Sequence, residues 1–250
     1  MRSAKGEHAM TAAASDGPGA ALRRALEALR DDAVAAHARR YFKAEPGGYG
    51  EGDQFLGIRV GDLRALARTH RAMPLDTVLD HLRAAWHEER LLALLIMVEQ
   101  DRRASADVRD RLHRAYLRHT EHVNNWDLVD VSAPQLVGSH VAPTDLALLD
   151  LLAASSSLWE RRIAMLATLW WTRANNVGPA LHVADRLLHD AHDLIHKAVG
   201  WLLREALKRD TERVEAFLAE RYRTMPRTAL RYAIERLPEA RRQAYLRGHV

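Results

Sequence analysis

The sequence has 250 residues, of which 48% are hydrophobic and 28% charged, which is the balance of a folded chain and excludes an intrinsically disordered one. No cysteine is present, so disulfides, cysteine-ligated zinc and iron–sulfur clusters are excluded. The formal net charge is +4, and this mild excess suits a nucleic-acid partner without requiring one, because an arginine-rich composition can also reflect a GC-rich genome.

Residues 1–19 are predicted to form a flexible tail, because they begin with basic residues but lack the apolar run of a secretory signal. The longest apolar stretches, such as Leu91 to Val98, are far too short to cross a bilayer. We therefore expect a cytoplasmic protein with no membrane contact, monomeric, with residues 20–250 forming a single domain.

Apolar residues recur at spacings of three and four along most of residues 20–250, which is the period of amphipathic helices. A long helix is predicted over 20–42, and the segment 45–54, with four glycines and a proline, ends it. Further helices are predicted over 59–71, 75–85, 87–103, 105–119, 123–135, 143–154, 157–173, 179–189, 193–208, 211–221, 226–236 and 238–248. No run alternates apolar and polar residues, so no sheet is expected.

Short and long helices alternate with tight breaks, and the pattern recurs about every 40 residues, which is the period of HEAT-type helix pairs. This rhythm predicts an all-α solenoid of about six helix pairs. A compact, irregular helical bundle is the alternative.

The segment VNNWDLVDVSAPQ places Trp126 and Asp130 four residues apart, so that they share one face of a helix. Asp127 falls on another side, near the helix start, where a carboxylate suits the helix dipole. Taken alone, such a pair is more often a core tryptophan beside a surface acid than a functional site.

Two later helices repeat this aromatic–ionic pattern. Trp159 and Arg162 stand three apart, and Lys197 and Trp201 stand four apart. Each pair alone fits a core aromatic beside a charge that reaches solvent, but three in succession indicate a basic and aromatic groove that follows a phosphate backbone. Gly200, beside Trp201, predicts a close approach of another segment.

Together with FLGIRVGDLRALAR (residues 55–68), these segments resemble the AlkD family of DNA alkylation repair glycosylases, from roughly Leu22 to Leu237. The landmarks are FLGIR, the W-D-x-V-D motif from Trp126 to Asp130, W-x-x-R from Trp159 to Arg162, and GW-x-L-R-E from Gly200 to Glu205. The resemblance implies an all-α, right-handed solenoid of antiparallel HEAT-like helix pairs with a concave DNA-binding groove, acting on duplex DNA without a cofactor.

The resemblance also assigns residues. Trp126 and Trp201 match the paired active-site tryptophans, Asp130 the catalytic carboxylate and Arg162 the active-site arginine, expected to hold a phosphate beside the lesion. Two departures, at Asn125 (an aromatic in the family) and at Arg59 (a glutamine), put the lesion preference in doubt. The residues expected to bind DNA are Arg59, Trp159, Arg161, Arg173, Lys197 and Arg204.

Such a set of residues suits the release of cationic bases. A purine alkylated at N3 or N7 is already a good leaving group, whereas the sugar becomes oxocarbenium-like and is stabilised by aromatic faces and a carboxylate. The alternatives are a non-catalytic HEAT-type module that binds DNA or protein, and a protein scaffold with no nucleic acid. Asp130 discriminates between them, because a pure DNA binder has little use for a carboxylate facing phosphates.

His189, His192 and His196 would align on an unbroken helix and could then form a metal site. Asp190 and Asp193 are good N-cap residues, however, and predict a turn through the cluster. We therefore expect no metal site here.

Overall fold

The structure is a computed structural model that describes residues 17–250. Residues 1–16 of the predicted tail lie outside this range, and its last residues, Pro18 and Gly19, instead begin the first helix. The helices are α1 (Pro18–Glu27), α2 (Asp32–Tyr41), α3 (Val60–Thr69), α4 (Leu75–Leu82), α5 (His87–Asp101), α6 (Ala106–Leu117), α7 (Trp126–Leu136), α8 (Ala147–Ala153), α9 (Leu158–Ala167), α10 (Leu169–Arg173), α11 (Gly178–Leu187), α12 (Asp193–Leu207), α13 (Thr211–Arg221), α14 (Arg227–Ala233) and α15 (Glu239–Arg247). Short 3-10 turns follow α6 and α7, and no strand forms within residues 17–250.

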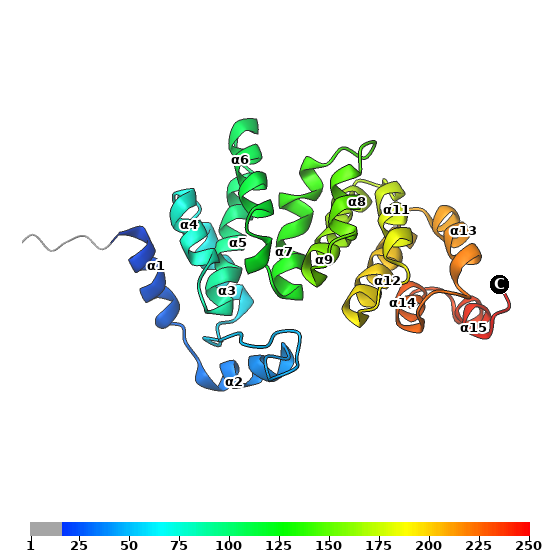
Figure 1. Cartoon of the computed structure of the whole chain (residues 1–250), viewed down its shortest axis with the longest axis horizontal. Coiled ribbons are helices and arrows are strands. Elements are labelled where there is room, and N and C mark those ends of the chain that lie inside the picture. Colours follow the sequence, from blue (N-terminus) through cyan, green and yellow to red (C-terminus); the bar gives the residue numbers. More distant parts are fainter. Residues whose placement is uncertain (1–16) are drawn as a thin grey trace, which may run out of the picture.

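The helices form a curved array of two rows (Figure 1). The inner row consists of α3, α5, α7, α9, α12 and α14, and each of its helices packs against the next. The other row consists of α4, α6, α8, α11 and α13, and α2 crosses beneath the inner row on the concave side of the array (Figure 1). The all-α architecture of stacked helix pairs is therefore confirmed.

Two predicted helices are each divided in the structure. Asp31 interrupts the helix predicted over 20–42, because its carboxylate accepts hydrogen bonds from the first N–H groups of α2, at Ala33 (3.0 Å) and Val34 (3.1 Å). The helix predicted over 157–173 breaks at Thr168, whose hydroxyl donates to the carbonyl of Met165 at 2.7 Å. Bonds of this kind compete with the helical pattern and bend the chain.

The core runs through the middle of the array. Helix α5 is buried on every side from His87 to Val98, because α3, α4 and α7 surround it. This explains why its apolar stretch shows little amphipathic character.

A buried carboxylate anchors the segment before α3. Glu88 accepts hydrogen bonds from the backbone N–H groups of Leu56 (2.9 Å) and Gly57 (2.8 Å). Gly57 has a φ of +81°, and a Cβ there would lie 2.0 Å from the carbonyl oxygen of Asp31. This position therefore requires glycine, and the FLGI segment is fixed beneath the start of α5.

Helices α12 and α14 approach each other closely at Gly200. A Cβ on this glycine would lie 2.4 Å from the carbonyl oxygen of Ala229 and 2.5 Å from the Cβ of Tyr232. The close approach predicted from the sequence is confirmed.

No helix in the described part of the chain combines the length and apolarity needed to span a bilayer.

Candidate functional site

One cavity on the inner row receives all four of the predicted catalytic side chains. Its volume is about 380 Å³, and its walls come from α2, α7, α9, α12 and α14 and from the segment after α2. Trp126 and Trp201, 75 positions apart in sequence, both line it. The full lining is Tyr41, Tyr49, Trp126, Asp130, Arg162, Leu194, Lys197, Trp201, Arg204 and Tyr232.

Helix α7 begins at the cavity. Asn125 is its N-cap residue, and its side-chain carbonyl accepts a hydrogen bond from the N–H of Trp126 at 2.8 Å. This asparagine is fully buried. Asn125 is one of the two departures from the family pattern, and in this chain it serves to start α7.

Asp130 and Arg162 form a bidentate ion pair across the cavity floor. The Nε and one terminal nitrogen of Arg162 each donate to a different Asp130 oxygen at 2.9 Å, and the other terminal nitrogen donates to the carbonyl of Leu194 at 2.8 Å. Burial raises the pKa of Asp130, and the positive charge of Arg162 opposes that rise. Because both oxygens accept hydrogen bonds, the arrangement is that of an ionised carboxylate.

Aromatic rings build the wall beside Trp126. Its ring lies 5.4 Å from the ring of Phe42 and 5.8 Å from that of Tyr41, measured between centroids. Tyr41 is exposed over 56% of its surface although it is large and aromatic. An exposed aromatic that borders a cavity is suited to contact a ligand base or sugar.

A buried ionic network lies behind this wall. The two ring nitrogens of His87 bond to Asp53 (3.1 Å) and Asp127 (2.8 Å), and Arg90 pairs with Asp53. Burial lowers the pKa of His87, but the bonds to Asp127 and Asp53 outweigh this effect and raise it to about 9. The imidazolium therefore joins the start of α5 to the start of α7. No motif in the sequence pointed to this network.

Of the residues predicted to bind DNA, Lys197 and Arg204 line the cavity. Lys197 pairs with Asp193 at 2.8 Å, and Arg204 pairs with Glu235. Arg173 is exposed and borders a neighbouring hollow of about 220 Å³ that shares Trp201 with the site.

The remaining three lie outside the cavity lining. Arg161 donates to Asp190 (2.6 Å) and to the carbonyls of Ser155 (3.1 Å) and Ser156 (2.9 Å), so it fastens two helix connections together. Its guanidinium group is therefore already engaged within the protein, and its predicted DNA contact stays a prediction. Trp159 is half-buried against Tyr49, with ring centroids 6.1 Å apart, and Arg59 is exposed at the start of α3.

The structure adds residues that the sequence analysis did not single out. Tyr41, Tyr49 and Tyr232 complete the cavity wall. Tyr49, a large aromatic within a glycine-rich break, was the one with a usable signal. On the inner row, the exposed Arg64 and Arg68 of α3 line a small hollow together with Val131 of α7, next to Asp130 in sequence.

The histidine cluster is interrupted, as predicted. Helix α11 ends at Leu187, and α12 begins at Asp193 with His192, rather than either aspartate, as its N-cap. His196 bonds to the backbone carbonyl of Asp190 at 2.5 Å. Across residues 17–250, no group of three or more histidine, cysteine or acidic side chains is arranged to hold a metal ion.

Known structures share this fold. A predicted DNA alkylation repair enzyme from Enterococcus faecalis superimposes with a TM-score of 0.65 at 20% identity, over 84% of this chain and 97% of that one. AlkD2 from Streptococcus mutans superimposes with a TM-score of 0.54 at 16% identity, over 82% of this chain and 98% of that one. A comparison with curated proteins finds no match. The sequence profile of the DNA alkylation repair enzyme family matches residues 22–237, and the chain therefore belongs to that family.

Proposed function

We propose that this protein is a DNA glycosylase that hydrolyses the N-glycosidic bond of cationic N3- or N7-alkylated purines in duplex DNA. The observation that carries the proposal is that Trp126, Trp201 and Asp130 line one cavity on the inner row of helices. A damaged nucleotide in this cavity would have two aromatic side chains and a carboxylate around its sugar and base.

The cavity lining suits a leaving group that needs no protonation. Its charged members are Asp130, Arg162, Lys197 and Arg204, and Asp130 is held by Arg162. An alkylated purine carries its own positive charge, so departure of the base needs no general acid. Each tryptophan face can stabilise a nearby cation by roughly 0.5–2 kcal/mol.

Asp130 would stabilise positive charge as it develops at the anomeric carbon and would position the attacking water. Arg162 orients the carboxylate through two hydrogen bonds of 2.9 Å, and two of its N–H groups remain for a phosphate beside the lesion. Phosphates farther along the duplex would contact Lys197, Arg204, Arg173 and Arg59, together with Arg64 and Arg68.

The test is single-turnover base release from matched duplexes that carry 7-methylguanine, 3-methyladenine, uracil, hypoxanthine or 8-oxoguanine. We expect release of the two methylated purines only, because the other bases are neutral and need a pocket with specific hydrogen bonds. Release of uracil with 7-methylguanine untouched would overturn the mechanism.

A second candidate is a non-catalytic module that binds DNA. It is favoured by the ion pair itself, because Arg162 neutralises Asp130, so that the carboxylate no longer repels a nearby phosphate. This reading predicts salt-dependent DNA binding with no base release from any of the five duplexes.

A further inference from the structure

A second cavity opens between α4 and α6, on helices that take no part in the candidate site. Its volume is about 470 Å³, and it is bordered by the α3–α4 connection, the end of α5 and the first half of α6. None of its lining residues belongs to the first cavity. Function at this position would therefore be separable from base release.

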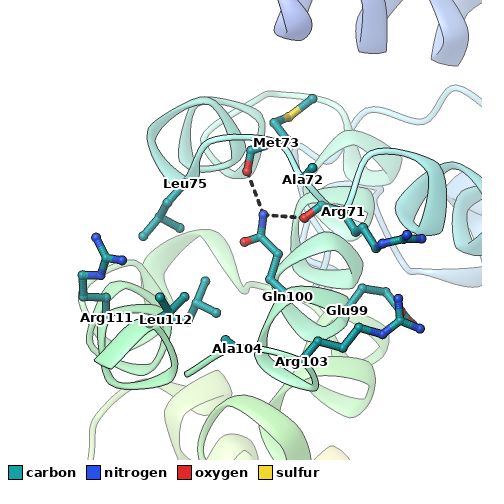
Figure 2. A pocket seen from close by; sticks show the side chains of 11 residues that line it. Arg71, Ala72, Met73, Leu75, Glu99, Gln100, Arg103, Ala104, Arg111 and Leu112 are labelled. Atoms are coloured by element: carbon teal, nitrogen blue, oxygen red, sulfur yellow. Dashed lines mark hydrogen bonds between the residues drawn. The ribbon is translucent and has the colours of Figure 1, made fainter. Parts of the chain in front are cut away.

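The floor of this cavity is apolar. Leu75 and Val108 are half-buried, whereas Met73 and Leu112 are buried. Figure 2 shows Leu75 and Leu112 facing the same space from opposite helices. The gap between these side chains offers a place for one apolar side chain of a ligand.

Gln100 presents a fixed acceptor to this space. Its side-chain nitrogen donates to the backbone carbonyls of Arg71 (3.0 Å) and Met73 (2.7 Å), which determines the orientation of the amide. The amide oxygen consequently points toward the cavity (Figure 2). Across residues 17–250, no side chain or backbone group donates a hydrogen bond to it. A ligand that carries an N–H group would satisfy it.

Arginines flank the cavity on two sides, with Arg111 on one and Arg71 and Arg103 on the other (Figure 2). Within the described chain, the guanidinium groups of Arg103 and Arg111 have neither a hydrogen bond nor an ion pair. Glu99, the acidic residue of the lining, is already paired with Arg102 at 3.0 Å. The cavity rim is therefore positively charged and open to an anion.

We propose that this cavity binds a short acidic peptide segment of a partner protein. The segment would insert an apolar side chain between Leu75 and Leu112, donate a backbone N–H to the Gln100 oxygen, and place a carboxylate against Arg111 or Arg103. A nucleic-acid backbone would engage the arginines but would leave the apolar floor and the Gln100 acceptor unused, so a peptide fits the whole set of groups better.

The probe is the dipeptide N-acetyl-leucyl-glutamate amide, titrated to millimolar concentration into the full-length protein labelled with 15N. We expect its backbone amide shifts to centre on Gln100, Arg103 and Leu112. Binding should weaken by up to about fivefold when glutamine replaces the glutamate of the probe, and by a similar factor in Arg111→Gln, since an exposed charge pair is worth up to about 1 kcal/mol. Arg118→Gln, an exposed arginine at the end of the same helix, is the matched control and should bind like the unmodified protein.

The proposal is overturned if no cavity resonance shifts, if the neutral dipeptide binds equally well, or if Arg118→Gln weakens binding as much as Arg111→Gln. It is also overturned if undamaged duplex DNA shifts the same resonances and displaces the dipeptide. Val108→Trp fills the cavity and should abolish dipeptide binding while base release from 7-methylguanine duplexes continues. The dipeptide titration itself reports on this cavity whether or not the protein proves to be a glycosylase.

Discussion

Arg162 holds Asp130 by both carboxylate oxygens, at 2.9 Å each, although 32 positions separate them in the sequence. The pair joins α7 to α9 at the floor of the candidate site. It gives Arg162 a definite task in the free protein, which is to orient the carboxylate and to keep it ionised despite burial.

Replacing Arg162 with alanine should therefore move the pH dependence of base release. Burial already raises the pKa of Asp130, and Arg162 is the group that opposes that rise, so its removal should raise the pKa further. The ionised fraction then falls off at a higher pH, so the acidic limb of the single-turnover rate profile should shift to higher pH. If Arg162 also contacts a phosphate, the slope of log affinity against log salt should fall by about one. An unchanged profile and an unchanged slope together would remove Arg162 from the site.

Asp130→Asn removes a charge with almost no change of volume. We expect base release to slow by at least about tenfold, equivalent to about 1.4 kcal/mol of barrier, while DNA affinity is retained. Asp150→Asn, on α8 in the other row, is the control and should keep the full rate. Equal single-turnover rates for Asp130→Asn and the unmodified protein would make Asp130 structural.

His87 predicts a dependence of stability on pH. Its pKa is raised from 6.5 to about 9 in the fold, so its stabilising contribution is complete below about pH 6.5 and is lost as the pH rises through about 9. The shift corresponds to about 3 kcal/mol in the free energy of unfolding. Urea denaturation across this range should show the decline, and His87→Gln should flatten it.

The matched control for His87 is His189→Gln, because His189 is exposed in the connection after α11. This variant should keep the decline in stability. The same slope in His87→Gln and in the unmodified protein would mean that the Asp53–His87–Asp127 network does not carry the pH dependence.

Two glycines give a paired test of helix packing. Gly200→Ala places a methyl group 2.4 Å from the carbonyl oxygen of Ala229, and we expect a loss of roughly 1–3 kcal/mol in unfolding free energy. Gly61→Ala, in α3, meets nothing within 4 Å and should instead stabilise the protein by about 0.5–1 kcal/mol. The two variants are compared by thermal melts. If their melting temperatures shift in the same direction, the described close approach of α12 and α14 is contradicted.

The exposed arginines of α3 predict a footprint on the DNA backbone. Arg64→Ala and Arg68→Ala should each weaken duplex binding and lower the log–log salt slope by about one, with little effect on the rate once DNA is saturating. Arg118→Ala, at the C-cap of α6 in the other row, should leave the slope unchanged. If the salt slope is unchanged in all three variants, the duplex does not contact these arginines of α3.

The sequence predicted the helices well because their amphipathic period and their breaks are local properties. The sequence predicted α1 and α2 as one helix, because the apolar spacing continues across Asp31. Its capping role depends on hydrogen bonds from two backbone N–H groups, which the spacing does not show. Of the site, it predicted the residues on α7, α9 and α12, where aromatic and charged side chains share a face.

The remaining parts of the site depend on tertiary contacts. Nothing local to Tyr232 or His87 indicates that α14 reaches the cavity or that two carboxylates from distant segments meet one imidazole. Nor does the sequence show that Asp190, 29 positions away, pairs with the guanidinium group of Arg161, a residue predicted to bind DNA. A sequence shows which side chains are charged, but it does not show which of them pair in the fold.

The cavity is walled by Tyr41 of α2 at one end of the array and by Tyr232 of α14 near the other. In a stack where each helix pair contacts mainly its neighbours, small rotations between successive pairs add up along the length. The distance between these two tyrosines therefore changes with the curvature of the whole helix array. A bound duplex that increases the curvature of the array would narrow the opening of the cavity around the nucleotide, and one that straightens the array would widen it. The stiffness of the DNA would therefore help to decide which DNA sites the protein binds.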